Sequence, residues 1–132
     1  MCSKDKPVVT ELEHLEHEIV ELAAQIHAAT CRWLELVAEF DRREGWSSWG
    51  CKSCAHWVAW RCAISPVAAR EHVRVARALV DLPLIRGAFA RGELSYSKVR
   101  ALTRVAGIER EEELVSMARH ATAAQLERIL GA

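Results

Sequence analysis

The chain has 132 residues, of which 51% are hydrophobic and 27% are charged, and its formal net charge is zero. This length is enough for one domain with its own core, and this composition excludes a disordered chain. No apolar run approaches the roughly 20 residues that cross a bilayer, and the N-terminus lacks a signal-peptide core, so we expect a cytoplasmic protein.

The first 44 residues predict one long helix. No proline or glycine interrupts residues 8–44, and Thr10 with Glu13 has the spacing of a capping box. We therefore expect a helix of roughly 34 residues, about 50 Å long. Its apolar residues repeat in sevens at two positions, which together form a narrow seam: Leu12, Ile19, Ile26, Trp33 and Phe40 at one, and Leu15, Leu22, Ala29 and Leu36 at the other.

A seam sustained over four heptads is typical of a coiled coil. Its partner is expected to be a second copy of the chain, giving a homodimer through the N-terminal helix, or another helix of the same chain. The alternative is a long amphipathic helix that lies across its own domain. Trp33, Val37 and Phe40 favour this alternative, because they widen the stripe near its C-terminal end.

A turn rich in glycine and tryptophan follows at residues 45–50. Trp57 and Trp60, three residues apart on the next predicted helix, are expected in the core. Four residues nearby could suggest a zinc site: Cys51, Cys54, His56 and Cys62. No second ligand pair follows at a usual interval, so we interpret these cysteines as free thiols and expect no metal or cofactor. Five cysteines, an odd number, also favour reduced thiols.

The remaining residues predict several short helices. Ser65 before Pro66 starts one that runs to Val80, and Leu82-Pro83 ends this segment. Further helices are expected at 84–91, at 96–106 after Ser95, at 110–120, and after the capping box of residues 122–125. No strand pattern occurs. We predict an all-α fold, with a long heptad-patterned helix at 1–44 and a compact multi-helix domain at 45–132 that has a helix-turn-helix-like core.

Charge is distributed unevenly. Residues 1–44 carry a net charge of −5 and residues 45–132 carry +5. Between Lys52 and Arg104, ten basic residues face three acidic ones, a balance of +7. Such a segment favours contact with a phosphate backbone, although the two halves could also attract each other. The candidate nucleic-acid-binding residues are Arg70, Arg74 and Arg77, at helical spacing, with Lys98, Arg100 and Arg104.

Three blocks carry a resemblance to a known family: WVAWRCAISPVAAREHVRVARALVDLP, GAFARGELSYSKVRALTRVA and ELVSMARHATAAQLERIL. From about residue 23 onward the chain resembles the domain of unknown function 222, also called the 13E12 repeat family. That bacterial domain commonly precedes a His-Asn-His nuclease module. The resemblance implies an all-helical accessory domain of DNA-processing proteins. The chain is expected to be truncated before the nuclease module.

Residues 53–83 are also similar to the helix-turn-helix region of ParB-type partition proteins. On that analogy residues 63–65 form the turn, and the helix of residues 66–80 enters a major groove. Val67, Ala68 and Ala69 are small and apolar at the start of this helix, so backbone contact is favoured over base reading.

These observations give two compatible hypotheses: a non-catalytic DNA-associated module, and a protein–protein interaction or dimerisation module without nucleic-acid contact. An enzyme is not expected. The sequence contains no asparagine, so it cannot supply a His-Asn-His centre, and its six histidines are dispersed.

Overall fold

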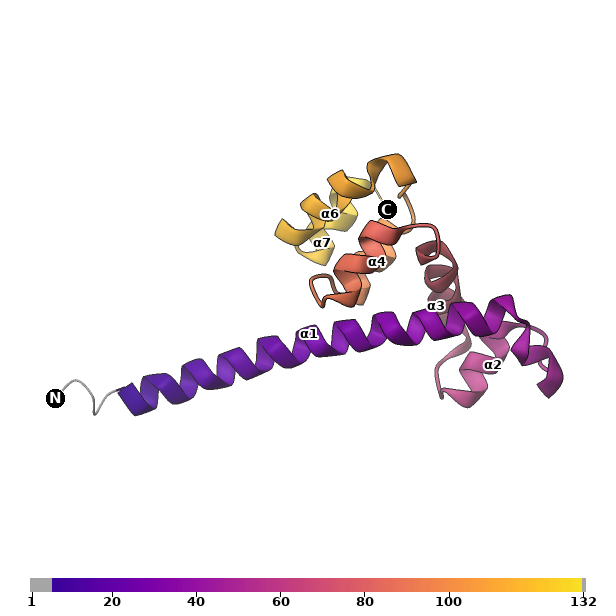
Figure 1. Ribbon diagram of the computed structural model, residues 1–132, viewed down its shortest axis with the longest axis horizontal. Helices are drawn as coiled ribbons and strands as arrows, with labels where there is room; N and C mark the ends of the chain where they lie inside the picture. The colour runs from indigo at the N-terminus through magenta and orange to yellow at the C-terminus, as the bar shows by residue number, and fades with distance from the viewer. Residues whose placement is uncertain (1–5, 132) are drawn as a thin grey trace.

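The computed structural model describes residues 6–131, with side chains described for residues 10–107 and 109–131 (Figure 1). Within this part the chain forms only helices and turns, which confirms the all-α prediction. Two 3₁₀ turns, η2 (Gly45–Trp49) and η3 (Ile108–Arg110), accompany the α-helices. These are α1 (Lys6–Arg42), α2 (Cys54–Arg61), α3 (Pro66–Leu79), α4 (Pro83–Ala90), α5 (Tyr96–Leu102), α6 (Glu111–His120) and α7 (Ala123–Leu130). None of the described helices is both long and apolar enough to cross a membrane.

Helix α1 is a rod whose N-terminal half extends beyond the other helices (Figure 1). It has 37 residues, so it is about 55 Å long. The predicted start was wrong: α1 begins at Lys6, and Thr10 lies inside it instead of capping it. Pro7 does not prevent this earlier start, because a proline in the first helical turn removes no intrahelical hydrogen bond.

Local side-chain caps start four of the later helices. In α2, α3, α5 and α7 the residue before the helix accepts a hydrogen bond from a backbone N–H three positions on. These capping residues are Ser53, Ser65, Ser95 and Thr122. The predicted starts at Ser65 and Ser95 and the predicted capping box of Thr122 with Gln125 are therefore confirmed. Helix α5 ends at Leu102, four residues earlier than predicted.

Helices α2 and α3 are joined by a tight turn at residues 62–65, as the helix-turn-helix likeness predicts. Ala63 adopts a left-handed backbone conformation there, with φ of 56°. The two helices pack directly on each other and on the C-terminal end of α1.

The hydrophobic core lies between the C-terminal half of α1 and the later helices. Cys31 and Leu34 of α1 are fully buried, as are Ile85 and Phe89 of α4. Residues on both sides of position 44 therefore share one interior. Gly92, after α4, approaches α1 so closely that a Cβ atom there would lie 2.6 Å from the carbonyl oxygen of Ala24.

Helix α4 begins in an unusual way, because its N-cap residue Leu82 has no side chain that can accept a hydrogen bond. Glu111 of α6 replaces the missing cap: its Oε1 accepts hydrogen bonds from the N–H groups of Leu84 and Ile85, both at 3.1 Å. Pro83 has no N–H to satisfy. Glu111 is only 2% exposed and is the single buried charged residue in the described part of the chain.

Candidate interaction surfaces

Three of the six predicted nucleic-acid-binding residues converge on one carboxylate, Glu71 of α3. Arg74 of the same helix donates to Glu71 from Nε at 2.6 Å, and Arg104 donates from Nη2 at 2.8 Å. Arg100 of α5 donates from Nε to Glu71 Oε2 as well. The hydrogen bond from Arg74, together with those from Arg100 and Arg104, holds the pKa of Glu71 well below its usual range. We call these four residues the Glu71 cluster.

The other three predicted residues lie in different surroundings. Arg77 reaches α1, where Nε donates to Asp41 Oδ2 at 2.6 Å. Lys98 donates from Nζ to the carbonyl oxygen of Ala118 at 2.8 Å. Arg70 is exposed and has no acidic partner among the described residues. The six side chains therefore do not form one free basic face, because several turn toward acidic or carbonyl partners on neighbouring elements.

The guanidinium groups of the Glu71 cluster are nevertheless accessible. The side chains of Arg74, Arg100 and Arg104 are 37%, 46% and 43% exposed, whereas that of Glu71 is 19% exposed. Three cations around one anion leave a formal charge of +2. Glu127 of α7 lies beside Arg100 and Arg104 in a small surface hollow and offsets part of this charge.

Helix α1 carries one buried apolar stripe and one exposed apolar stripe. One contains Cys31 and Leu34 and is buried against the other helices. The second is the predicted seam. Successive residues turn by about 100°, so Leu36 lies about 200° around the helix from Leu34. Six seam residues are more than half exposed: Leu12 (61%), Leu15 (55%), Ile19 (61%), Leu22 (58%), Ile26 (57%) and Leu36 (52%).

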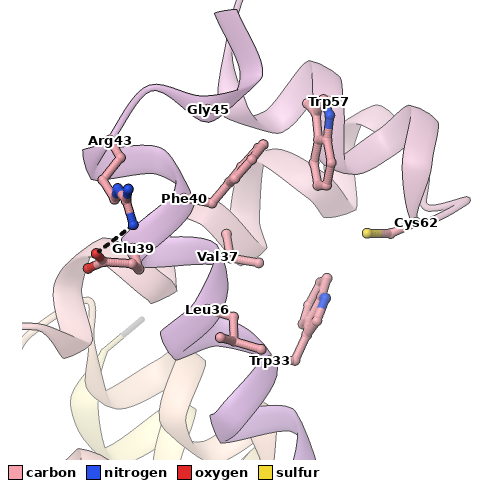
Figure 2. A pocket seen from close by; sticks show the side chains of 9 residues that line it. All are labelled: Trp33, Leu36, Val37, Glu39, Phe40, Arg43, Gly45, Trp57 and Cys62. Atoms are coloured by element: carbon pink, nitrogen blue, oxygen red, sulfur yellow. Dashed lines mark ion pairs between the residues drawn. The ribbon is translucent and has the colours of Figure 1, made fainter. Parts of the chain in front are cut away.

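The C-terminal end of the seam opens into a pocket of about 620 Å³ between α1 and α2 (Figure 2). Trp33, Leu36 and Phe40 line it from α1, and Trp57 lines it from α2. The rings of Phe40 and Trp57 lie 4.3 Å apart between centroids. The widening of the stripe at Trp33 and Phe40 is thus where α1 meets its own domain, while the narrower seam before it stays uncovered.

The comparison with known families finds a match over most of the chain. A family model described as "Domain of unknown function (DUF222)" matches residues 10–131. The chain belongs to the DUF222 family. The match includes both the exposed seam of α1 and the Glu71 cluster, so both features lie within the DUF222 region. Comparisons with curated proteins and with solved structures gave no match.

In this DUF222 chain the cysteine-rich segment forms no clustered site. No three or more His, Cys, Asp or Glu side chains within the described residues are placed to hold a metal ion. His56 Nδ1 instead accepts a hydrogen bond from the backbone N–H of Lys52 at 3.2 Å. Cys54 is fully buried, and burial is the main cause that raises its pKa to about 11.

Sequence reasoning missed an aromatic cluster around Arg61 of this DUF222 chain. Its guanidinium carbon lies 5.1 Å from the ring centroid of Trp49 and 5.3 Å from that of Trp60. The prediction that Trp60 is a core residue was wrong, because its side chain is 56% exposed. The buried positions of α2 are Cys54 and Val58, and Trp60 points about 200° away from Val58. The sequence signal that could have predicted this cluster is that Trp49, Trp57 and Trp60 all come shortly before Arg61.

Proposed function

We propose that this chain is a non-catalytic association module that pairs with a partner helix through the seam of α1. The observation that carries this proposal is the row of six seam side chains along α1, each more than half exposed. A contiguous exposed apolar stripe of this kind marks a protein interaction site more often than a solvated surface.

The size of the seam supports association of modest strength. Covering the exposed half of a leucine or isoleucine contributes about 1 kcal/mol. Six such side chains, facing an equal number from a partner, supply on the order of 12 kcal/mol, while association costs about 4–15 kcal/mol. At the lower cost the net of about 8 kcal/mol corresponds to pairing in the micromolar range, so we do not expect a complex that forms at any concentration.

Sedimentation of the full chain tests this proposal. We expect concentration-dependent association at about 50 μM, which Leu22→Glu abolishes by placing a charge in the seam. Val20→Glu is the matched control, because Val20 is 69% exposed on the same helix but lies outside the seam. Circular dichroism should show that both variants keep their helices. A wild-type chain that is monomeric at this concentration would contradict the proposal.

A second candidate function is contact with a nucleic-acid backbone, and the Glu71 cluster is the observation that favours it. Its three guanidinium groups remain more than a third exposed and exceed their carboxylate partner in charge. Arg70, exposed on α3, lies one residue before Glu71 and adds another cation. In this role the chain would bind DNA and leave catalysis to a nuclease module of the kind that the family resemblance implies.

Mobility-shift titrations at several salt concentrations test this second candidate. The logarithm of the affinity should fall with the logarithm of salt by about 0.9 per phosphate contact. Glu71→Gln should raise the affinity by about threefold to tenfold, because three arginines lose their anion, and Arg70→Ala should reduce the salt slope by about one contact. Arg42→Ala is the control, since Arg42 pairs with Glu39 on α1. Absence of binding at low salt would exclude this function.

A further inference from the structure

We infer, building on the seam association proposed above, that the partner helix is α1 of a second copy and that the two helices run antiparallel. Each seam residue would then face a seam residue of the second copy, and the two residue numbers of every facing pair would add to 48. Seam positions alternate by three and four residues, so reversing one helix preserves a constant sum along the whole interface. The interface has a twofold axis near residue 24.

This arrangement pairs apolar side chains in every seam layer between residues 12 and 36. Four kinds of layer occur, each twice by symmetry: Leu12 with Leu36, Leu15 with Trp33, Ile19 with Ala29, and Leu22 with Ile26. The smallest seam residue, Ala29, faces a β-branched isoleucine. The interface therefore contains no buried polar group and no layer made of two small residues.

Charges beside the seam disfavour one neighbouring register. Glu18 of one copy lies opposite Arg32 of the other, twice by symmetry, and Gln25 faces its own counterpart at the twofold axis. Arg32 is free to make this contact, because its side chain is 69% exposed and its ion pair with Glu35 is loose, at 3.7 Å. The next antiparallel register, with a sum of 55, would instead bring Glu18 beside Glu39.

One unfavourable pair occurs in the proposed register, where Glu11 lies opposite Glu39. Glu39 is already hydrogen-bonded by Arg42, whose Nη2 donates to Oε2, and Arg43 lies 3.9 Å away. These two guanidinium groups offset the repulsion. The pair lies at the exposed edge of the interface, where the cost is small.

A parallel pair is disfavoured by the acidic half of α1. Residues 10–31 contain five glutamates and no lysine or arginine. A parallel pair would place ten glutamates side by side, whereas an antiparallel pair keeps the two acidic halves apart.

The pocket at the end of the seam is compatible with the antiparallel arrangement. Trp33 and Leu36 belong both to the seam and to the pocket lining (Figure 2). In the antiparallel pair, Leu15 and Leu12 of the partner lie over these two residues and cover the mouth of the pocket. In a parallel pair, Trp33 and Leu36 of the second copy would lie there instead.

Cysteine cross-linking in the full chain tests the orientation. Cys2, Cys51 and Cys62 are first replaced by serine, while Cys31 and Cys54 remain because both are fully buried. A short bifunctional maleimide is then applied to Gln25→Cys or to Glu11→Cys. The two positions are equivalent in the heptad, but only residue 25 faces itself across the twofold axis. We expect about tenfold more covalent dimer for Gln25→Cys than for Glu11→Cys.

The outcomes separate this inference from the proposed function. Equal yields at both positions would indicate a parallel pair and overturn the inference, although association itself would stand. Cross-linking of Gln25→Cys only when it is mixed with Arg32→Cys would indicate the register with a sum of 55, and would also overturn it. A chain that sediments as a monomer would remove both proposals. A Glu18→Cys and Arg32→Cys mixture that cross-links more than either variant alone would support the register.

Discussion

Arg77 on α3 donates two hydrogen bonds to Asp41 on α1, from Nε to Oδ2 at 2.6 Å and from Nη2 to Oδ1 at 3.0 Å. This bidentate pair joins the long helix to the domain that follows it. The hydrogen bond from Arg77 is the main cause that lowers the pKa of Asp41 from its ordinary value of 3.8. A carboxylate whose pKa is lowered by folding stabilises the folded chain at every pH at which it is ionised.

The first prediction concerns the pH dependence of this pair. Asp41→Asn should lower the free energy of unfolding near neutral pH by about 1 kcal/mol, because Arg77 is largely exposed and the attraction is screened. The contribution of Asp41 is present above its ordinary pKa and is lost as the pH falls through its lowered pKa in the folded chain. The difference in the free energy of unfolding between Asp41→Asn and wild type should therefore become smaller below about pH 4.

Urea unfolding at a series of pH values measures this difference. Glu39→Gln serves as a control, since its partner Arg42 is on the same helix and the pair does not join two elements. A difference between Asp41→Asn and wild type that stayed constant from neutral to acidic pH would show that the Arg77 pair contributes nothing through charge.

The second prediction concerns Glu111, which caps the N-terminus of α4 from α6. Glu111→Ala should destabilise the fold by about 2–4 kcal/mol, because it leaves the buried N–H of Ile85 and the partly buried N–H of Leu84 without an acceptor. Glu111→Gln keeps an acceptor oxygen and should cost less. Thermal or urea unfolding measures both variants. Glu112→Ala, a change at an exposed neighbour on α6, should have little effect. Equal losses for the alanine and glutamine variants at 111 would contradict the capping role.

The third prediction compares two glycines that both have positive φ. Gly92 has φ of 78° and faces the backbone of Ala24, whereas Gly50 has φ of 74° and open space around it. Alanine at Gly50 should cost about 1 kcal/mol, the penalty of the left-handed backbone alone. Alanine at Gly92 should cost more than about 2 kcal/mol, because the loop must also move away from α1. Chemical unfolding of the two variants gives the comparison, and equal losses would show that the close approach is unimportant.

The fourth prediction concerns thiol reactivity. Burial is the main cause that raises the pKa values of Cys31 and Cys54 to about 11. At pH 8 these two thiols should react with iodoacetamide about 100-fold more slowly than the partly exposed Cys51 and Cys62. Mass spectrometry after timed labelling measures each site. In urea all four should react at similar rates, so persistent differences there would point to a cause other than the fold.

The features that sequence reasoning predicted correctly are local. Ser65, Ser95 and Thr122 start helices because each side chain bonds a backbone group only three residues away. The seam of α1 was also visible, because a repeat of seven depends on nothing outside the helix. The predicted start at Thr10 failed because the spacing of a capping box does not show whether the helix has already begun.

The partners of the basic residues could not be predicted, because they are distant in sequence. Glu71 meets Arg100 and Arg104 across 29 and 33 positions, and Arg77 meets Asp41 across 36. Counting charges over residues 52–104 therefore overstated how much free positive charge the surface carries. One distant contact did leave a signal: Leu82-Pro83 starts a helix without a capping side chain, so an acceptor had to come from elsewhere.

The capping of α4 by Glu111 of α6 affects the order in which a chain synthesised from its N-terminus can fold. The first turn of α4 is made 26 residues before Glu111. Until that glutamate emerges, the N–H groups of Leu84 and Ile85, of which the second becomes buried, have only water as a partner. We therefore expect the packing of α4 against α1 to gain its full stability only after α6 has been synthesised.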